Sequence, residues 1–285
     1  MIEIEINKLY LVTGGGGFLG QPLVKDIFNK GGRVRVMGRD EGTLVYLKEV
    51  YPDVEIFTGD ISDAFEVQQA MKGVDGVFHL AASKHVGLAE TFPRECLKTN
   101  VIGSLNIFEQ SLKQPLDFIL SISTDKAAQV VGVYGATKLL MERLSKQYEA
   151  LNPNCQYRIV RYGNVLYSTG SVLCKWKALI ENGEDVIVTE PSATRFFWTV
   201  EQALELIYQC MEEAIDSTPF CPNMKSMSIE NLLTAMVQKY SNGIEINFNV
   251  IGLQAGENLH EKVLDEGPYS NEVEEFTIEE IKKMI

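Results

Sequence analysis

The chain has 285 residues, of which 45% are hydrophobic and 23% are charged, a composition typical of a soluble globular protein. This length suffices for one large domain, or for a domain with a smaller lobe. The net charge of −13 excludes the nucleic-acid binders as a class, because there is no basic field to neutralise phosphates.

Five cysteines, an odd and widely spaced set, indicate reduced thiols rather than a disulfide framework. The three histidines show no helical ligand spacing, so we expect no metal. The N-terminal residues lack the basic region and long apolar core of a signal peptide, and no apolar run approaches the length of a membrane span. We therefore expect a cytoplasmic protein with neither a membrane nor a nucleic-acid partner.

The first strand-like run, residues 8–13, leads into Gly14-Gly-Gly-Gly-Phe-Leu-Gly20 and then into an amphipathic segment that stops at Gly31-Gly32. Strand, glycine loop and helix in this order are the context of a dinucleotide-binding loop. The glycines permit a tight turn, close approach of a pyrophosphate, and helix–strand packing. The expected cofactor-binding residues here are Thr13, Gly14, Gly16, Gly17, Phe18, Leu19 and Gly20.

Five more strand-like runs alternate with segments of helical periodicity centred near residues 45, 67, 105 and 142. The runs are residues 33–37, 54–57, 76–80, 118–122 and 157–162. This alternation predicts an α/β fold, a doubly wound and mostly parallel Rossmann-like sheet. We expect residues 1–165 to form the dinucleotide-binding domain with the catalytic residues. Residues 166–285 should form mainly a smaller C-terminal substrate lobe, with the chain crossing back to the first domain.

The position after the second strand distinguishes NAD from NADP. An acidic residue there would hold the ribose hydroxyls of NAD, whereas Arg39 suits the 2′-phosphate of NADP. Because Asp40 adjoins it, NAD remains the alternative to NADP. Asp60 and Ile61, after the third strand, should flank the adenine. The residues expected against the middle of the cofactor follow the fourth strand and are Ala81, Ala82 and Ser83.

The stretch from Ser121 to Lys138 places an acid, an amine and a phenol–lysine couple together. Asp125 and Lys126 end a strand at the edge that faces the cofactor crevice; a solvated turn pair is the alternative. Tyr134 and Lys138 are four residues apart and share one helix face. Bringing a Tyr pKa from near 10 to near 7 takes about 4 kcal/mol, which a fixed ammonium in a partly dry cleft can supply.

Together these motifs resemble the extended short-chain dehydrogenase/reductase superfamily, and within it the polysaccharide-biosynthesis branch that includes inverting UDP-N-acetylglucosamine 4,6-dehydratases. The resemblance runs from about residue 8 to about residue 266. It rests on His79-Leu-Ala-Ala-Ser-Lys-His-Val86, Glu95-Cys-Leu-Lys-Thr-Asn-Val101, Ser123-Thr-Asp-Lys-Ala-Ala128, Arg161-Tyr-Gly-Asn-Val165, Ser168-Thr-Gly-Ser-Val172, Thr194-Arg-Phe196 and Gly256-Glu-Asn-Leu-His-Glu261.

The resemblance implies an NADP-dependent hydro-lyase that converts UDP-N-acetylglucosamine into a UDP-4-keto-6-deoxy-hexosamine with inversion at carbon 5, for glycan biosynthesis. Tyr134 would then be the base for the 4-hydroxyl, steadied by Lys138. Lys126 would remove the proton on carbon 5, and Asp125 would protonate the departing 6-hydroxyl. Thr124 could orient the substrate.

Further binding residues follow from the same resemblance. The additional cofactor contacts would be Tyr162, Asn164 and Val165. The substrate contacts would be Lys84, His85, Asn164, Ser171, Val172, Arg195 and Glu257. Arg195 is the expected phosphate clamp, with a structural Arg that caps a helix as its alternative. We also expect a homodimer or larger homo-oligomer that pairs through the helical segments 94–113 and 134–149.

Three departures and two rival functions bear on this hypothesis. Gln254-Ala255-Gly256-Glu257-Asn258 stands where similar enzymes have Arg-Pro-Gly-Glu-Lys, so two cations near the nucleotide diphosphate are absent. Cys174 replaces a frequent Pro, and Gln129-Val130 replaces Asn-Pro. A nucleotide-sugar 4-epimerase would not need Asp125–Lys126, and a non-enzymatic NADP-binding regulator would not need Tyr134 and Lys138.

Overall fold

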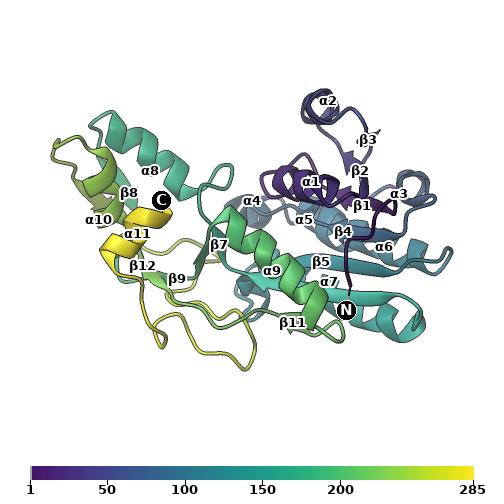
Figure 1. The fold of residues 1–285 in the computed structure, drawn as a ribbon. Coiled ribbons are helices and arrows are strands. Elements are labelled where there is room, and N and C mark those ends of the chain that lie inside the picture. Colours follow the sequence, from purple (N-terminus) through teal and green to yellow (C-terminus); the bar gives the residue numbers. More distant parts are fainter. Residues whose placement is uncertain (1) are drawn as a thin grey trace.

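The alternating strands and helices of the first half build one parallel sheet (Figure 1). The structure is a computed structural model that describes residues 2–285. The strands of this half are β1 (Leu9–Thr13), β2 (Arg33–Gly38), β3 (Glu55–Thr58), β4 (Gly76–His79), β5 (Phe118–Thr124) and β6 (Gln156–Tyr162). With β11 (Pro219–Phe220) they form, within the described residues, a seven-stranded sheet in the order β11-β6-β5-β4-β1-β2-β3. Every pairing is parallel, which confirms the predicted fold class.

Helices cover both faces of the sheet because each presents an apolar stripe to it. They are α1 (Gly20–Asn29), α2 (Glu41–Val50), α3 (Ala64–Met71), α4 (Val86–Thr91), α5 (Pro93–Leu97), α6 (Gly103–Ser111) and α7 (Val133–Leu151), with the π-helical turn η1 (Lys98–Ile102) and the 3-10 turn η2 (Asp125–Ala127). Leu23 of α1 and Leu44 of α2 lie in one buried cluster. Val67 of α3, Ile107 of α6 and Met141 of α7 lie in the cluster on the other face.

The second half of the chain adds a helix to the sheet and forms a separate hydrophobic core. Its elements are β7 (Asn164–Val165), α8 (Val172–Glu181), β8 (Val186–Val188), β9 (Thr194–Arg195), β10 (Phe197–Trp198), α9 (Val200–Glu213), β12 (Met227–Ser228), α10 (Ile229–Tyr240), β13 (Phe248–Val250) and α11 (Ile278–Met284). Helix α9 returns to the sheet, where Leu206 and Ile207 join the α1 cluster. Helices α8, α10 and α11 surround a separate core that includes Trp176, Leu232 and Ile281. The division at residue 165 stays a prediction.

Helix starts follow the capping chemistry of the sequence. Asp40 caps α2 by accepting a bond from the backbone N–H of Thr43, and Asp63 caps α3. Thr199 and Gln202 form a capping box at the start of α9. No helix within residues 2–285 combines the length and the apolar character that crossing a bilayer requires.

Candidate active site

The glycine loop joins β1 to α1 and lies at the carboxyl edge of the sheet. Gly14 has φ +69°, a conformation that favours glycine. A Cβ on Gly14 would also stand 2.9 Å from the Ala81 backbone, so the loop and the end of β4 are in close contact. Among the residues that the structure describes, no side chain caps the N-terminus of α1, which suits this helix end to the pyrophosphate of a dinucleotide. The hydroxyl of Thr13 is buried and bonds to Nδ1 of His79 at 2.8 Å.

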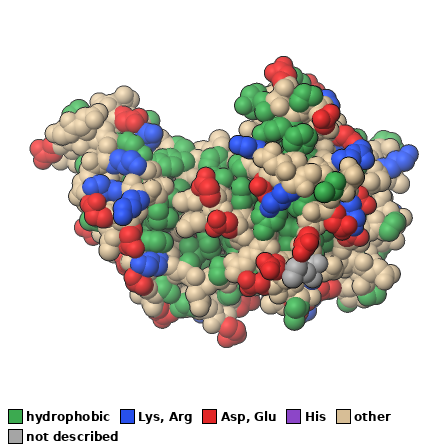
Figure 2. Space-filling model, in the orientation of Figure 1, with side chains coloured by type: hydrophobic (Ala, Val, Ile, Leu, Met, Phe, Trp, Pro, Cys, Tyr) green, Lys and Arg blue, Asp and Glu red, His purple; other side chains and the backbone are tan. Residues whose placement is uncertain are grey.

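A cleft of about 800 Å³ opens beside this loop. Gly16, Gly17 and Phe18 line it from the loop, and Lys84 and His85 line it from the segment after β4. Figure 2 shows this face of the molecule hollowed between the part around α8 and the part around α1 and α2. The structure therefore brings residues predicted for the cofactor and residues predicted for the substrate to one cleft.

Two cations gather near the end of β2. The side chain of Arg39 is 69% exposed, and its Nη1 lies 3.6 Å from Oδ2 of Asp60. Nζ of Lys98, which the sequence analysis did not select, lies 3.9 Å from the same oxygen. Asp40, the neighbour that favoured NAD, is used as the N-cap of α2. Ile61 is buried next to Gly103.

The segment after β4 is held in place by Asn100, a second residue that the sequence analysis did not select. Its Oδ1 accepts the backbone N–H of Ser83 at 2.7 Å, and its Nδ2 donates to the Ser83 carbonyl at 2.9 Å. The same Nδ2 donates to Oγ1 of Thr137, at 3.0 Å, on α7. Asn100 thus ties the loop of Ala81, Ala82 and Ser83 to the helix that carries Tyr134 and Lys138.

The predicted acid and amine follow directly after β5. Oγ1 of Thr124 donates to Oδ1 of Asp125 at 2.7 Å, and the backbone N–H of Lys126 donates to the same oxygen at 2.8 Å. Nζ of Lys126 lies 3.2 Å from that oxygen. Asp125 is only 2% exposed. Asp125 and Lys126 therefore form a buried ion pair, to which Thr124 donates a hydrogen bond, rather than a solvated turn.

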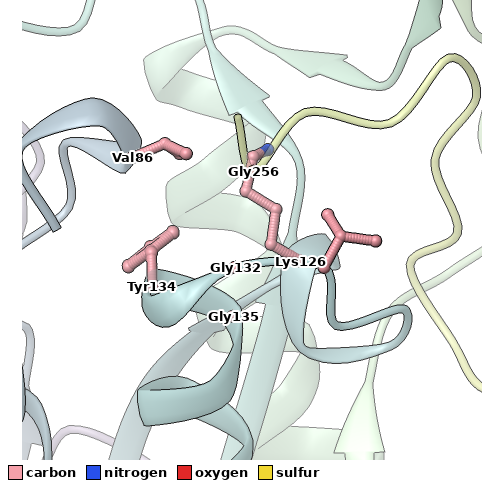
Figure 3. Close-up of a pocket in the computed structure, with 7 residues that line it drawn as sticks. Val86, Lys126, Gly132, Tyr134, Gly135 and Gly256 are labelled. Atoms are coloured by element: carbon pink, nitrogen blue, oxygen red, sulfur yellow. The ribbon is translucent and has the colours of Figure 1, made fainter. Parts of the chain in front are cut away.

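Tyr134 enters from the start of α7 and lines the same pocket as Lys126. Figure 3 shows the Lys126 side chain reaching toward Gly256, with Tyr134 among the lining residues. A Cβ on Gly135 would stand 2.2 Å from the carbonyl oxygen of Lys126, so only glycine allows α7 to approach so closely. Lys138 lies on the next turn of α7 and is buried.

Burial and Lys126 control the acidity of the phenol. Burial raises the pKa of Tyr134 to about 12, and the Lys126 ammonium is the largest opposing influence. Burial lowers the pKa of Lys138 to about 8. The sequence analysis assigned to Lys138 the cation that stabilises the phenolate of Tyr134. The structure adds a second cation, Lys126, which lies directly after β5.

Glu261 joins this centre, and the sequence analysis did not assign it a catalytic role. Its Oε1 lies 3.1 Å from Nζ of Lys126 and 3.2 Å from Nε of Arg195. Its Oε2 accepts a bond from Nδ2 of Asn164 at 3.4 Å. The quoted stretch Gly256–Glu261 contained it, but its partner Lys126 is 135 residues away.

Asp125, Lys126 and Glu261 shift one another's pKa values. Burial raises the pKa of Glu261 to about 7, with Asp125 as the next cause. Burial opposes the charge on Asp125, but the Lys126 ammonium and the hydrogen bonds to the carboxylate together outweigh it and lower the pKa of Asp125. Burial likewise opposes the charge on Lys126, and Asp125 and Glu261 outweigh it, so the pKa of Lys126 is raised. The resting centre therefore holds an ammonium between two carboxyl groups.

The other predicted substrate residues, all within the described part of the chain, do not line the cleft beside the glycine loop, and their surroundings differ. The guanidinium of Arg195 is buried, and Nη1 donates to the carbonyls of Thr194 and Leu259, so its role as a phosphate clamp stays a prediction. Ser171 precedes α8, and Val172 begins it and is exposed. Glu257 accepts the backbone N–H of Gln254. Tyr162 ends β6, and Val165 ends β7.

A glycine loop after β1, a tyrosine–lysine pair on α7 and an acid–lysine pair after β5 meet at one edge of a parallel sheet. This combination of fold and site defines an enzyme of the extended short-chain dehydrogenase/reductase type. The chain belongs to the polysaccharide biosynthesis protein family, whose model matches residues 10–283.

Individual relatives cover most of the chain. It is 34% identical to a UDP-N-acetylglucosamine 4,6-dehydratase (inverting) of Campylobacter jejuni over 90% of this chain and 77% of that protein. It is 30% identical to a UDP-glucose 4-epimerase of Rickettsia akari over 91% of this chain and 78% of that protein. Pen from Bacillus thuringiensis has a similar structure, with a TM-score of 0.86 and 30% identity, covering 91% of this chain and 81% of that one.

Proposed function

We propose that this protein is a nucleotide-sugar 4,6-dehydratase that acts on UDP-N-acetylglucosamine and inverts carbon 5. The observation that carries the proposal is the buried Asp125–Lys126 ion pair, whose Lys126 lines one pocket with Tyr134. A dehydratase needs an acid and a base beyond the group that serves the oxidation. The similarity to the Campylobacter jejuni enzyme supports the choice of substrate.

The residues divide the chemistry between them. A nicotinamide held at the glycine loop would supply the redox chemistry, a transfer of hydride from carbon 4 of the sugar and its return to carbon 6. Oη of Tyr134 takes the proton of the 4-hydroxyl only as the phenolate, so its pKa of about 12 in the resting centre must fall when substrate and cofactor bind.

After the oxidation, the carbon-5 proton of the sugar is acidic because it lies beside a ketone. Nζ of Lys126 removes that proton, and Asp125 protonates the departing 6-hydroxyl, which leaves as water. Return of hydride to carbon 6 would leave an enolate, to which a solvent-derived proton adds at carbon 5 on the opposite face, and Tyr134 releases its proton to solvent.

The Asp125–Lys126 contact makes this division possible. Lys126 can accept a proton only as a neutral amine, and Asp125 can donate one only as a carboxylic acid. Both forms arise when the single proton of the resting pair moves across the 3.2 Å contact from Lys126 to Asp125. The pKa shifts of the resting centre oppose this transfer, so the bound substrate and cofactor have to favour the neutral pair. After the carbon-5 proton reaches Lys126 and the Asp125 proton leaves with the hydroxyl, the resting ion pair is restored.

NADP is the proposed cofactor. The guanidinium of Arg39, which follows β2, and the ammonium of Lys98 both approach Asp60. A 2′-phosphate bound near the end of β2 would need charge-assisted partners of this kind. Asp40 is already engaged as a helix cap, which weakens the case for NAD.

One incubation tests the reaction class. The protein is incubated with UDP-N-acetylglucosamine in heavy water, and the product is analysed by NMR and mass spectrometry. We expect a product lighter by one water and labelled at carbon 5. A product with unchanged composition and altered configuration at carbon 4 would instead identify an epimerase, the second candidate, which the Rickettsia akari relative favours.

A further inference from the structure

Glu261 lies where the second half of the chain touches the reacting groups of the first. Its side chain is 4% exposed, and it reaches Lys126 of η2, Arg195 of β9 and Asn164 of β7. Nothing in the division of chemistry described above uses it. A buried carboxylate is costly unless it is paired and hydrogen-bonded, so its position needs an explanation.

A chain of hydrogen bonds through Ser270 to Thr194 fixes the backbone of Glu261. Its backbone N–H donates to Oγ of Ser270 at 2.9 Å, and that hydroxyl donates to the carbonyl of Thr194 at 3.0 Å. Oγ1 of Thr194 in turn bonds to Nδ1 of His260 at 2.8 Å. Glu261 is therefore positioned by its own segment and by β9 before any substrate binds, as a group that orients a reacting side chain must be.

The amine of Lys126 lies between the carboxyl groups of Glu261 and Asp125. Nζ is 3.1 Å from Oε1 of Glu261 and 3.2 Å from Oδ1 of Asp125. A lysine side chain has a flexible stem, and a single contact to the adjacent Asp125 does not fix where its amine lies. The second contact, from a segment far along the chain, defines that position.

We propose that Glu261 is a positioning residue of the reaction centre: it holds the Lys126 amine in place beside Asp125 and controls how readily that amine loses its proton. This inference rests on the proposed function for its catalytic consequence, but the contact itself can be tested without any turnover. Asp125, Lys126 and Arg195 are the charged groups that face Glu261, and Asn164 is its neutral partner.

The first test measures the reactivity of Lys126. Acetic anhydride acetylates only neutral amines, so its rate at each lysine, read by peptide mass spectrometry, reports the unprotonated fraction. In Glu261→Gln the Lys126 rate should rise at least about tenfold, since one pKa unit changes that fraction tenfold. Buried Lys138 and exposed Lys72 are internal controls and should keep their parent rates. The exposed Glu266→Gln, five residues further along the segment, is the matched control variant.

The second test measures turnover. Glu261→Gln should lower kcat for dehydration about 10- to 100-fold, because a misplaced base loses the advantage of orientation, while KM changes less than about twofold. Glu261→Asp, which retains a carboxylate, should recover part of kcat, and Glu266→Gln should match the parent.

The outcomes separate the two proposals. An unchanged Lys126 rate in Glu261→Gln, a rise shared equally by Lys138, or an unchanged kcat would overturn the role of Glu261. If the parent protein dehydrates no nucleotide sugar, the proposed function is wrong. The acetylation rates then still decide whether Glu261 controls the Lys126 amine.

Discussion

At the scale of single residues, the buried pair after β5 sets the order of the chemical steps. Tyr134→Phe removes the group that begins the oxidation, so dehydration and carbon-5 exchange should both fail. Lys126→Ala removes the carbon-5 base and also the cation that opposes the raised pKa of Tyr134. The oxidation should therefore be slower but should still occur, and absorbance of reduced nicotinamide should accumulate without release of water. We expect dehydration to fall by about 10²–10⁴-fold, measured by stopped-flow absorbance and product mass.

Lys72→Ala serves as the control for this prediction, because Lys72 is exposed and follows α3. It should turn over like the parent. Parent-rate turnover by Lys126→Ala, or carbon-5 labelling by Tyr134→Phe, would show that these roles are misassigned.

The raised pKa of Glu261 predicts a pH-dependent stability. Its carboxyl group has an ordinary value of 4.5 and a value of about 7 in the folded protein. The folded state therefore binds this proton more tightly than the unfolded state, and the stabilisation is complete below pH 4.5 and lost as the pH rises through 7. Each pKa unit between the two states is worth about 1.4 kcal/mol.

Glu261→Gln has no proton to lose at this position, so its free energy of unfolding should fall less than that of the parent between pH 4.5 and 7. Urea denaturation at several pH values measures the difference, with Glu266→Gln as the control for an exposed carboxyl group. Parallel pH dependences in the parent and Glu261→Gln would contradict the prediction.

At the scale of elements, the contact between α7 and η2 aligns Tyr134 with Lys126. Gly135→Ala would place a Cβ 2.2 Å from the Lys126 carbonyl oxygen, so one of the two elements must shift. We expect a loss of about 10²-fold in kcat, from misplacement of the reacting groups, together with a lower Tm. Gly87→Ala on α4 is the matched control, because its added Cβ meets no atom within 4 Å. Equal activity and Tm in the two variants would disprove the importance of this contact.

The end of β2 should determine the choice of dinucleotide. Arg39→Ala removes a charge-assisted partner of a 2′-phosphate, so it should weaken NADP binding by about tenfold or more and NAD binding little. Lys98→Ala should act in the same direction because its ammonium approaches the same Asp60. Calorimetry with both dinucleotides measures the effect, and equal losses for NADP and NAD would remove Arg39 and Lys98 as selectors.

At the scale of the whole molecule, the helical segments 94–113 and 134–149 are predicted to pair two copies of the chain. Apolar side chains remain exposed on them, including Leu97 of α5, Ile102 of η1 and Leu140 of α7. Light scattering at micromolar concentration should therefore give at least twice the chain mass of 31.9 kDa. Leu140→Glu should shift the protein toward monomer, and a monomeric parent would refute the prediction.

The sequence by itself determined the parts of this protein that depend on local spacing. The run predicted at 118–122 is β5, which extends two residues further to Thr124, and the glycine loop does connect β1 to α1. Parallel strands end at a common edge, so the loop, the Asp125–Lys126 pair and Tyr134 were expected to meet there. Four-residue spacing was enough to place Tyr134 and Lys138 on one helix.

Only the tertiary structure decided which distant groups complete the centre. Lys126 and Glu261 are 135 residues apart, and Arg195 and Asn164 reach Glu261 from two further strands. Likewise Asn100 joins Ser83 to Thr137 across three segments. Periodicity and motif spacing describe contacts within one element. Contacts between elements depend on how the packed core orients them. Burial raises the pKa of Glu261, and the neighbouring carboxyl groups keep Lys126 charged despite its burial.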